Sequence, residues 1–115
     1  MTAFVGANRI RADSPEALER VIESFRGRAG LVEKRPGFRG LLVLVDREAL
    51  EVLVLSFWES REAFKSWVDS EEFRVAHERA RARRLEGVTS EGRGYEVVEA
   101  AGPMSEILTS KETDI

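Results

Sequence analysis

Short apolar stretches with the composition of strands recur along the chain, and polar or turn-forming residues bound each of them. They lie at Thr2–Ile10, Phe38–Val45, Glu51–Trp58 and Tyr95–Glu99. The second and third stretches are joined by a short polar segment, so we expect them to form a hairpin. The segment Gly87–Gly94 begins and ends with glycine and is expected to be a loop.

Amphipathic stretches lie between these strands. Their apolar residues recur every three or four positions, which predicts helices packed on a flat surface. The first helix is expected to begin at Pro15 and to end before Pro36, because the residue before a proline resists helical geometry. A short helix is expected after Ser60, followed by a break and a longer helix over Glu71 to about Leu85.

The resulting order, βαββαβ, predicts an α+β fold, a ferredoxin-like sandwich with helices on one face of an antiparallel sheet. The hairpin stretches LLVLV and VLVLSFW are apolar at both odd and even positions, whereas a sheet with one wet face should alternate. The uncovered face would expose a hydrophobic patch. We therefore predict a symmetric homodimer in which two sheets pack face to face, a dimeric α+β barrel. The alternative is that short apolar stretches simply alternate imperfectly.

Composition limits the possible functions. With 115 residues the chain can form one core, and we expect a single domain over residues 1–100 and a loose polar tail over residues 101–115. The formal net charge of −3 argues against a nucleic-acid partner. The absence of cysteine excludes disulfides and thiolate metal sites. The sequence shows no membrane-spanning stretch and no secretory signal, so we expect a cytoplasmic protein without a membrane partner.

The only histidine, His77, follows Phe73 by four residues, which places both side chains on one helical face. A neutral imidazole is a good axial ligand for iron, although a single histidine is more often a packed or surface residue. Trp67 is expected to point toward the sheet, where a large indole usually fills the core.

Asn8 lies on a strand face that is otherwise made of Phe4, Gly6 and Ile10 and that should face the helices. A buried carboxamide without a hydrogen-bond partner costs about 1–3 kcal/mol. Its partner is therefore either nearby backbone or a bound ligand. Gly6 leaves space beside Asn8, although it could also mark a bulge.

A basic run follows His77, with acidic residues around it. A solvated helix face explains this pattern best, although an arginine there could also pair with a carboxylate-bearing ligand. The run consists of Arg79, Arg81, Arg83 and Arg84. We find no catalytic triad, no HExxH motif and no phosphate-binding glycine loop.

Together these stretches resemble the haem-degrading monooxygenases of the antibiotic-biosynthesis monooxygenase superfamily, from about Phe4 to Val98. The Trp58-Glu59-Ser60 signature occurs across the superfamily and indicates only the fold. The combination of Asn8, Trp67 and His77 distinguishes the haem-degrading branch. The other matching stretches are Ala7-Asn8-Arg9-Ile10, Phe25 with Arg28 and Gly30, Pro36-Gly37-Phe38, Ala63-Phe64 and Phe73 with Ala76-His77.

The resemblance implies that His77 binds haem iron on the proximal side and that the Asn8 amide bonds the iron-bound ligand on the distal side. Trp67 would press on the porphyrin and hold it out of plane. Further cofactor-binding residues are expected to be Gly6, Phe25, Phe64 and Phe73. Haem would be both cofactor and substrate, with O2 as oxidant. A separate reductase or small reductant would supply electrons, because the chain has no flavin or nicotinamide motif.

Three other functions stay open at this stage. The same pocket could bind or buffer haem without degrading it. Asn8 and Trp67 could instead contact a polycyclic aromatic or quinone in a cofactor-free monooxygenase of the same superfamily. A pocket filled by the protein's own side chains would indicate a plain dimeric interaction domain.

Overall fold

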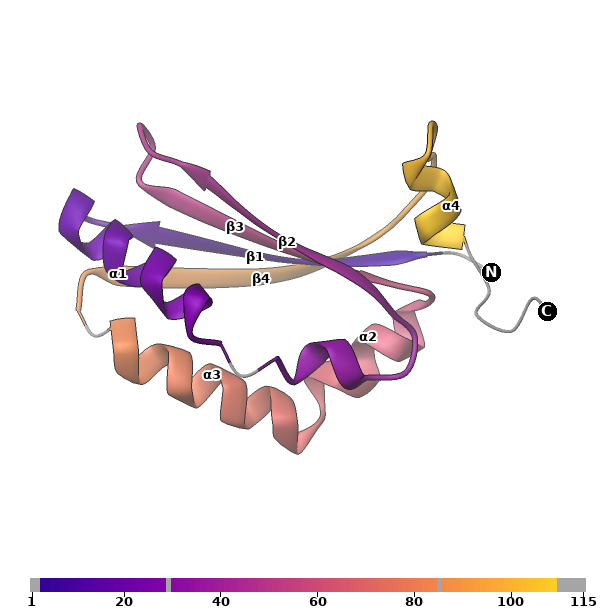
Figure 1. Cartoon of the computed structure of the whole chain (residues 1–115), viewed down its shortest axis with the longest axis horizontal. Helices are drawn as coiled ribbons and strands as arrows, with labels where there is room; N and C mark the ends of the chain where they lie inside the picture. Colours follow the sequence, from indigo (N-terminus) through magenta and orange to yellow (C-terminus); the bar gives the residue numbers. More distant parts are fainter. Residues whose placement is uncertain (1–2, 29, 85, 110–115) are drawn as a thin grey trace.

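The computed structural model of the chain describes residues 3–28, 30–84 and 86–109, with the backbone alone for residues 80–84 and 109. Four strands and four α-helices follow one another, with one turn of 3-10 helix between the first helix and the second strand (Figure 1). The elements are β1 (Phe4–Ala12), α1 (Pro15–Arg26), η1 (Val32–Lys34), β2 (Phe38–Asp46), β3 (Glu51–Trp58), α2 (Arg61–Val68), α3 (Glu71–Arg84), β4 (Val88–Glu96) and α4 (Met104–Thr109).

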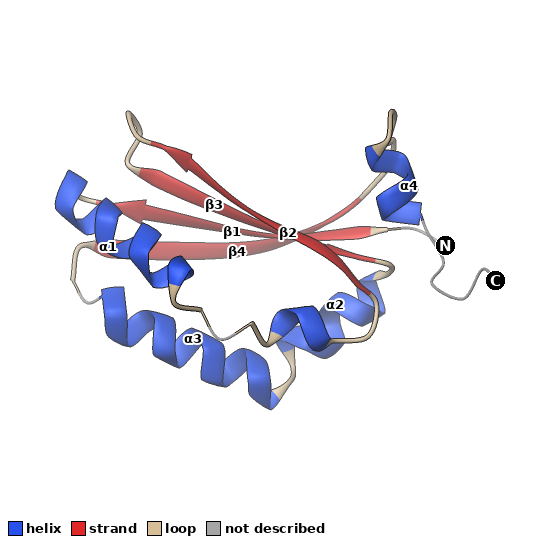
Figure 2. Cartoon of the chain, viewed as in Figure 1, coloured by secondary structure: helices blue, strands red, loops and turns tan. Residues whose placement is uncertain are grey.

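The strands form one antiparallel sheet in the order β2-β3-β1-β4. Helices α1, α2 and α3 lie on one side of this sheet, and α4 lies on the other side near the N-terminus (Figure 2). This arrangement confirms the predicted α+β ferredoxin-like fold. Over the described residues, no helix combines the length and apolar character that a membrane crossing requires.

Serine caps begin the helices where the sequence predicts them. The Ala17 backbone N–H donates to Ser14 Oγ, and the Ala63 N–H donates to Ser60 Oγ, each over 3.1 Å. Ser70 ends one helix and begins the next, because its Oγ donates to the Trp67 carbonyl and accepts from the Phe73 N–H. This double role produces the predicted break between α2 and α3.

Three boundaries differ from the predictions. The loop expected over Gly87–Gly94 is wrong, since β4 runs over Val88–Glu96 and pairs with all of β1. The first helix ends at Arg26, about ten residues before Pro36, where Gly27 caps it. The tail was expected to be loose, but residues 104–109 form α4; Leu85 and residues 110–115 lie outside the described residues.

The core is divided between the two faces of the sheet. On the helix side, Ile10 and Val52 pack with α1, and an aromatic cluster forms around the fully buried Trp58. On the opposite face, Leu108 of α4 packs with Phe57 at one end of the sheet. α4 therefore buries part of a face that would otherwise be open.

Glycines bring the aromatic rings close to the sheet backbone. A Cβ at Gly6 would overlap the Phe64 ring of α2 and would lie 2.8 Å from Ser56 Oγ. A Cβ at Gly94 would lie 2.6 Å from Phe4. Gly94, which contributed to the loop prediction, thus has a packing role within β4, as Gly6 has within β1.

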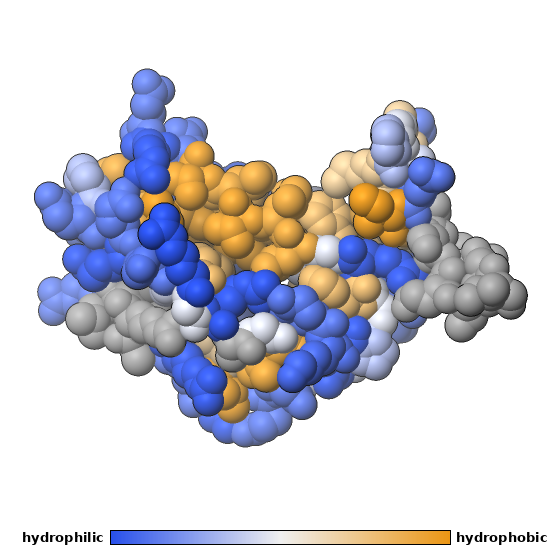
Figure 3. Space-filling view, in the orientation of Figure 1, coloured by the Kyte–Doolittle hydropathy of each residue, from blue (hydrophilic) through white to orange (hydrophobic). Residues whose placement is uncertain are grey.

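Over β2 and β3, the face opposite the helices is apolar and open to solvent, whereas Arg9, Arg11, Glu91 and Arg93 lie on the same face of β1 and β4. Leu42 and Leu44 pair in register with Leu55 and Leu53 on this face, and each of the two β2 leucines is 44% exposed. Tyr95 of β4 is 49% exposed. Figure 3 shows this apolar surface over β2 and β3, in a hollow between the hairpin end and α4. We call the exposed Leu42, Leu44 and Tyr95, together with the half-buried Leu53 and Leu55, the outer apolar face.

Replacing Gly6 with alanine tests the close packing of Phe64. The new methyl group would have to displace a ring that Phe4 and Trp58 hold in place, so Gly6→Ala should lower the free energy of unfolding by about 1–3 kcal/mol. Urea denaturation followed by circular dichroism measures this change.

Gly92→Ala is the matched control in the neighbouring strand. Its methyl group would meet nothing closer than the Ala7 carbonyl at 4.0 Å, so stability should change by less than about 0.5 kcal/mol. Equal destabilisation by both variants would contradict the packing account.

Candidate functional site

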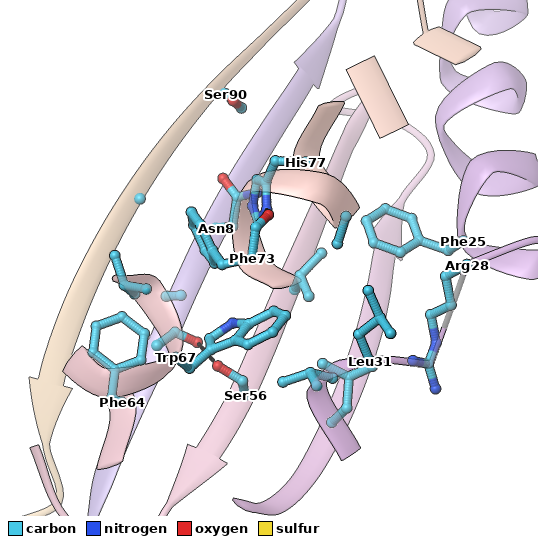
Figure 4. A pocket seen from close by; sticks show the side chains of 18 of the residues that line it. Asn8, Phe25, Arg28, Leu31, Ser56, Phe64, Trp67, Phe73, His77 and Ser90 are labelled. Carbon is cyan, nitrogen blue, oxygen red and sulfur yellow. Dashed lines mark hydrogen bonds between the residues drawn. The ribbon is translucent and has the colours of Figure 1, made fainter. Parts of the chain in front are cut away.

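A cavity of about 550 Å³ lies between the sheet and the helices. The sheet forms its floor, α2 and α3 form one wall, and the end of α1 with the segment after it forms the other (Figure 4). Helix α3 packs mainly against α1 and α2. Its sequence EEFRVAHERARARR has few large apolar residues to draw it onto the sheet, which explains why space remains beneath it.

All the residues that the sequence predicts for the site line this one cavity. They are Gly6, Asn8, Phe25, Phe64, Trp67, Phe73 and His77. The cavity is open to solvent and is not filled by the protein's own side chains. Phe4, which shares a strand face with Asn8, packs on Phe64 outside the lining, with ring centroids 5.3 Å apart.

Asn8 brings a half-buried carboxamide to the cavity floor. Its neighbours in register are Val54 on β3 and Gly92 on β4, which are small enough to leave the amide uncovered. Within the described part of the chain, no hydrogen bond of the Asn8 side chain is found. Of the two sequence interpretations, a bond to nearby backbone is therefore not made, and the amide is available to a ligand.

His77 lies on α3 at the exposed side of the cavity, and its ring stacks on Phe73 with centroids 3.8 Å apart. This contact confirms that the two side chains share a helical face. His77 Nδ1 lies 2.9 Å from the Phe73 carbonyl oxygen. A carbonyl only accepts, so this contact assigns a proton to Nδ1, and in the neutral imidazole the lone pair is then on Nε2, the tautomer in which histidine coordinates a metal through Nε2.

Trp67 is both a core residue and a cavity wall. It is 7% exposed, stacks on Trp58 with centroids 6.5 Å apart, and meets Phe73 edge to face at 5.4 Å. Trp58 in turn donates its indole N–H to Ser56 Oγ over 2.9 Å. These contacts fix the orientation of the Trp67 ring, so it presents a rigid surface to the cavity.

The charged side chains that line the cavity are basic although the whole protein is acidic. Arg28 and Arg79 line it, and among the described lining residues none is acidic. Arg93 also borders the cavity, but its register partner is Ala7, so its side chain lies on the opposite face of the sheet, where it pairs with Glu91. The Arg28 guanidinium forms a two-armed pair with the Glu33 carboxylate, at 2.7 and 2.5 Å. This pair raises the pKa of Arg28 and lowers the pKa of Glu33. The arrangement favours a ligand that is apolar and carries negative charge.

Neither arginine was predicted as a site residue from its position in the sequence. Arg79 belongs to the run after His77, in which one arginine was expected to be able to pair with a carboxylate, and Arg28 is part of the family resemblance only. Ser56, which also lines the cavity, was missed too. Its polar side chain at a helix-facing position of an apolar strand is the signal that could have identified it. Over the described residues, no group of three or more His, Asp or Glu side chains could hold a metal ion without a cofactor.

Comparison with known proteins agrees with this geometry. A model of the family described as "antibiotic biosynthesis monooxygenase" matches residues 4–79. The chain belongs to the antibiotic biosynthesis monooxygenase family. Staphylococcus aureus (strain Newman) heme oxygenase (staphylobilin-producing) 1 is 34% identical over 83 residues, which cover 70% of this chain and 76% of the relative. The chain is thus an antibiotic biosynthesis monooxygenase family protein with moderate similarity to a heme oxygenase.

Solved structures of the family share the fold. A putative antibiotic biosynthesis monooxygenase from Bacillus cereus has a TM-score of 0.72 and 26% identity, covering 89% of this chain and 99% of that one. An arginine-to-serine mutant of MhuD, solved with two manganese protoporphyrin IX molecules bound per active site, has a TM-score of 0.69 and 30% identity, covering 86% and 98%. SnoaB, a cofactor-independent oxygenase from Streptomyces nogalater, has a TM-score of 0.66 at 20% identity, covering 90% and 99%, which shows the fold alone.

The tautomer of His77 can be measured directly, because the chain has no other histidine. We expect the long-range 1H–15N spectrum at pH 8 to show a larger Nδ1-protonated population in the folded protein than in urea, since the Phe73 carbonyl holds that proton. The unfolded chain is the control. An Nε2-protonated ring that dominates equally in both states would contradict the assignment.

Proposed function

We propose that the protein is a haem-degrading monooxygenase that binds haem through His77 and opens the porphyrin ring with O2 and electrons from an external donor. One observation carries this proposal: an uncovered Asn8 amide on the sheet and a His77 imidazole on α3 line the same apolar cavity. The similarity to a heme oxygenase and to a porphyrin-bound MhuD structure supports it.

The residues present fit haem. A cavity of about 550 Å³ lies within the range of small-molecule and cofactor sites. The aromatic rings of Phe25, Phe64, Trp67 and Phe73 suit a flat apolar macrocycle, and Arg28 and Arg79 suit its two propionate carboxylates. The lone pair on His77 Nε2 suits its iron. A neutral polycyclic substrate would use neither the imidazole nor the arginines, so the cofactor-free alternative is less favoured.

When bound, haem supplies the iron and the redox chemistry, and it is itself the substrate that is opened. The residues of this chain bind and orient it. The hydrogen bond from Nδ1 to the Phe73 carbonyl aims Nε2 of His77 and increases its basicity. The Asn8 amide donates a hydrogen bond into the cavity from the sheet. Trp67, which Trp58 and Phe73 hold rigid, would contact the bound porphyrin. The electrons come from a reductase or small reductant, because the chain contains neither a flavin motif nor a cysteine.

Titration with haemin tests binding and turnover separately. We expect a saturable Soret band, which then disappears with release of iron to a ferrous chelator when ascorbate is added in air. Asn8→Ala should keep the Soret band and slow its loss by about tenfold or more, the effect of removing a preorganised hydrogen-bond donor. The haem complex of His77→Ala should lack the absorption spectrum of histidine-coordinated haem.

Glu78→Gln is the matched control on the same helix, since Glu78 pairs with Arg74 and is not among the lining residues. Saturable binding without loss of the band would favour the non-catalytic haem-binding alternative. Unsaturable adsorption of haemin would contradict both the haem-degrading function and the non-catalytic haem-binding function.

We also propose that two copies of this chain associate through the outer apolar face. Leu42, Leu44 and Tyr95 are each more than two-fifths exposed on the side of the sheet that α1, α2 and α3 leave open. A contiguous apolar surface of this kind is typical of an interface. In a symmetric dimer, the same leucines of both copies would meet at the interface. This is the dimer predicted from the hairpin strands, which are apolar at both odd and even positions.

Leu42→Asp combined with Leu44→Asp should convert the protein from dimer to monomer, because each association would bury unpaired carboxylates. Sedimentation velocity measures the mass, and circular dichroism checks that the fold is kept. Lys65→Gln combined with Lys34→Gln changes the net charge equally on the helix side of the molecule and should leave the dimer intact. A wild-type monomer at micromolar concentration would contradict the proposal.

A further inference from the structure

The ion pair between Arg28 and Glu33 lies at the wall of the cavity that the end of α1 and the segment after it form. Arg28 follows the last residue of α1 by two positions and lines the cavity, whereas Glu33 lies in η1 and is not among the lining residues. Both guanidinium arms are bonded to Glu33, NH1 to Oε1 at 2.7 Å and NH2 to Oε2 at 2.5 Å. The two side chains are 36% and 41% exposed, so solvent and small ions reach the pair.

The carboxylate of Glu33 occupies one pair of Arg28 donors, one N–H on each terminal nitrogen, through which a ligand carboxylate could bind end-on. A guanidinium binds a carboxylate best through two parallel hydrogen bonds, and those of Arg28 already go to Glu33. A ligand carboxylate with the same geometry must therefore displace Glu33. The ligand carboxylate forms as many hydrogen bonds to Arg28 as Glu33 loses, and the released Glu33 carboxylate is hydrated.

We propose that Arg28 is the residue that receives a propionate carboxylate of the bound porphyrin, and that Glu33 is an exchangeable internal counter-ion that competes for it. This inference rests on the proposed function, because it takes the ligand to be a porphyrin dicarboxylate. Glu33 then lowers affinity for every carboxylate-bearing ligand and leaves affinity for neutral aromatic ligands unchanged. The pair also keeps a positive group in place beside an apolar cavity when no ligand is bound.

The test compares haemin with haemin dimethyl ester, which lacks the carboxylates. Both are titrated by quenching of tryptophan fluorescence, since Trp67 lines the cavity and Trp58 stacks on it. Glu33→Gln should tighten haemin binding about two- to fivefold, the effect of removing an exposed competing ion pair. Arg28→Gln should weaken haemin binding about tenfold, the loss of a charge-assisted pair. Neither variant should change binding of the ester.

Two further variants separate exchange from a structural role. In the Arg28→Gln background, Glu33→Gln should not change the affinity for haemin further, because the guanidinium for which Glu33 competes has been removed. Glu71→Gln is the matched control: it removes the same charge from an exposed arginine–glutamate pair, with Arg74 on α3, outside the cavity lining. It should leave both affinities unchanged.

The outcomes distinguish this inference from the proposed function. If the wild-type protein binds haemin saturably but Glu33→Gln binds it equally or more weakly, the exchange is overturned and the proposed function stands. If both single variants weaken haemin and its ester alike, the pair is structural and the exchange is again overturned. If the wild-type protein binds neither ligand saturably, the proposed function itself fails.

Discussion

The site depends on how closely the Phe64 ring approaches the sheet. Gly6 has no side chain, so this ring lies directly on β1 and holds α2 down against the sheet. Phe64 also contacts Phe4 and Trp58, which extends the contact into an aromatic cluster at one end of the molecule. Ser70 then ends α2 and starts α3 in a new direction. Tight packing at α2 and looser packing at α3 together leave the cavity.

The same cluster supplies the walls and the reactive groups. Phe73 stacks on His77, holds its proton through its own carbonyl and touches Trp67. The aromatic contacts therefore stabilise the fold and fix the imidazole and the indole in the orientations that a flat ligand would meet. Such preorganisation matters because a site that is held rigid loses little entropy when its ligand binds.

Much of this architecture was predictable from local sequence, because serine caps and apolar periods act over a few residues. The caps at Ser14 and Ser60 and the bounds of β3 follow the predictions closely. Most of β4 was not predicted, because the expected last strand, Tyr95–Glu99, overlaps it only at Tyr95 and Glu96. Gly92 and Gly94 are usual in loops, and the packing role of Gly94 depends on the Phe4 and Phe64 rings from distant parts of the chain. α4 was missed for the same reason, since Leu108 gains its apolar surroundings only by packing on Ala3 and Phe57.

The candidate site was predictable where one residue type stands out. His77 is the single imidazole and Asn8 is a polar residue on an apolar face, so both could be selected without knowing their surroundings. Arg28 could not be selected in this way, because it is one arginine among many and its place beside the cavity follows from the end of α1.

The most direct measurement is the resonance Raman spectrum of the ferrous haem complex under argon. If His77 Nε2 is the axial ligand, the wild-type protein shows an iron–histidine stretching band that is absent from His77→Ala and is retained in Asn8→Ala. A band that persists in His77→Ala, or a wild-type complex without one, would contradict the account.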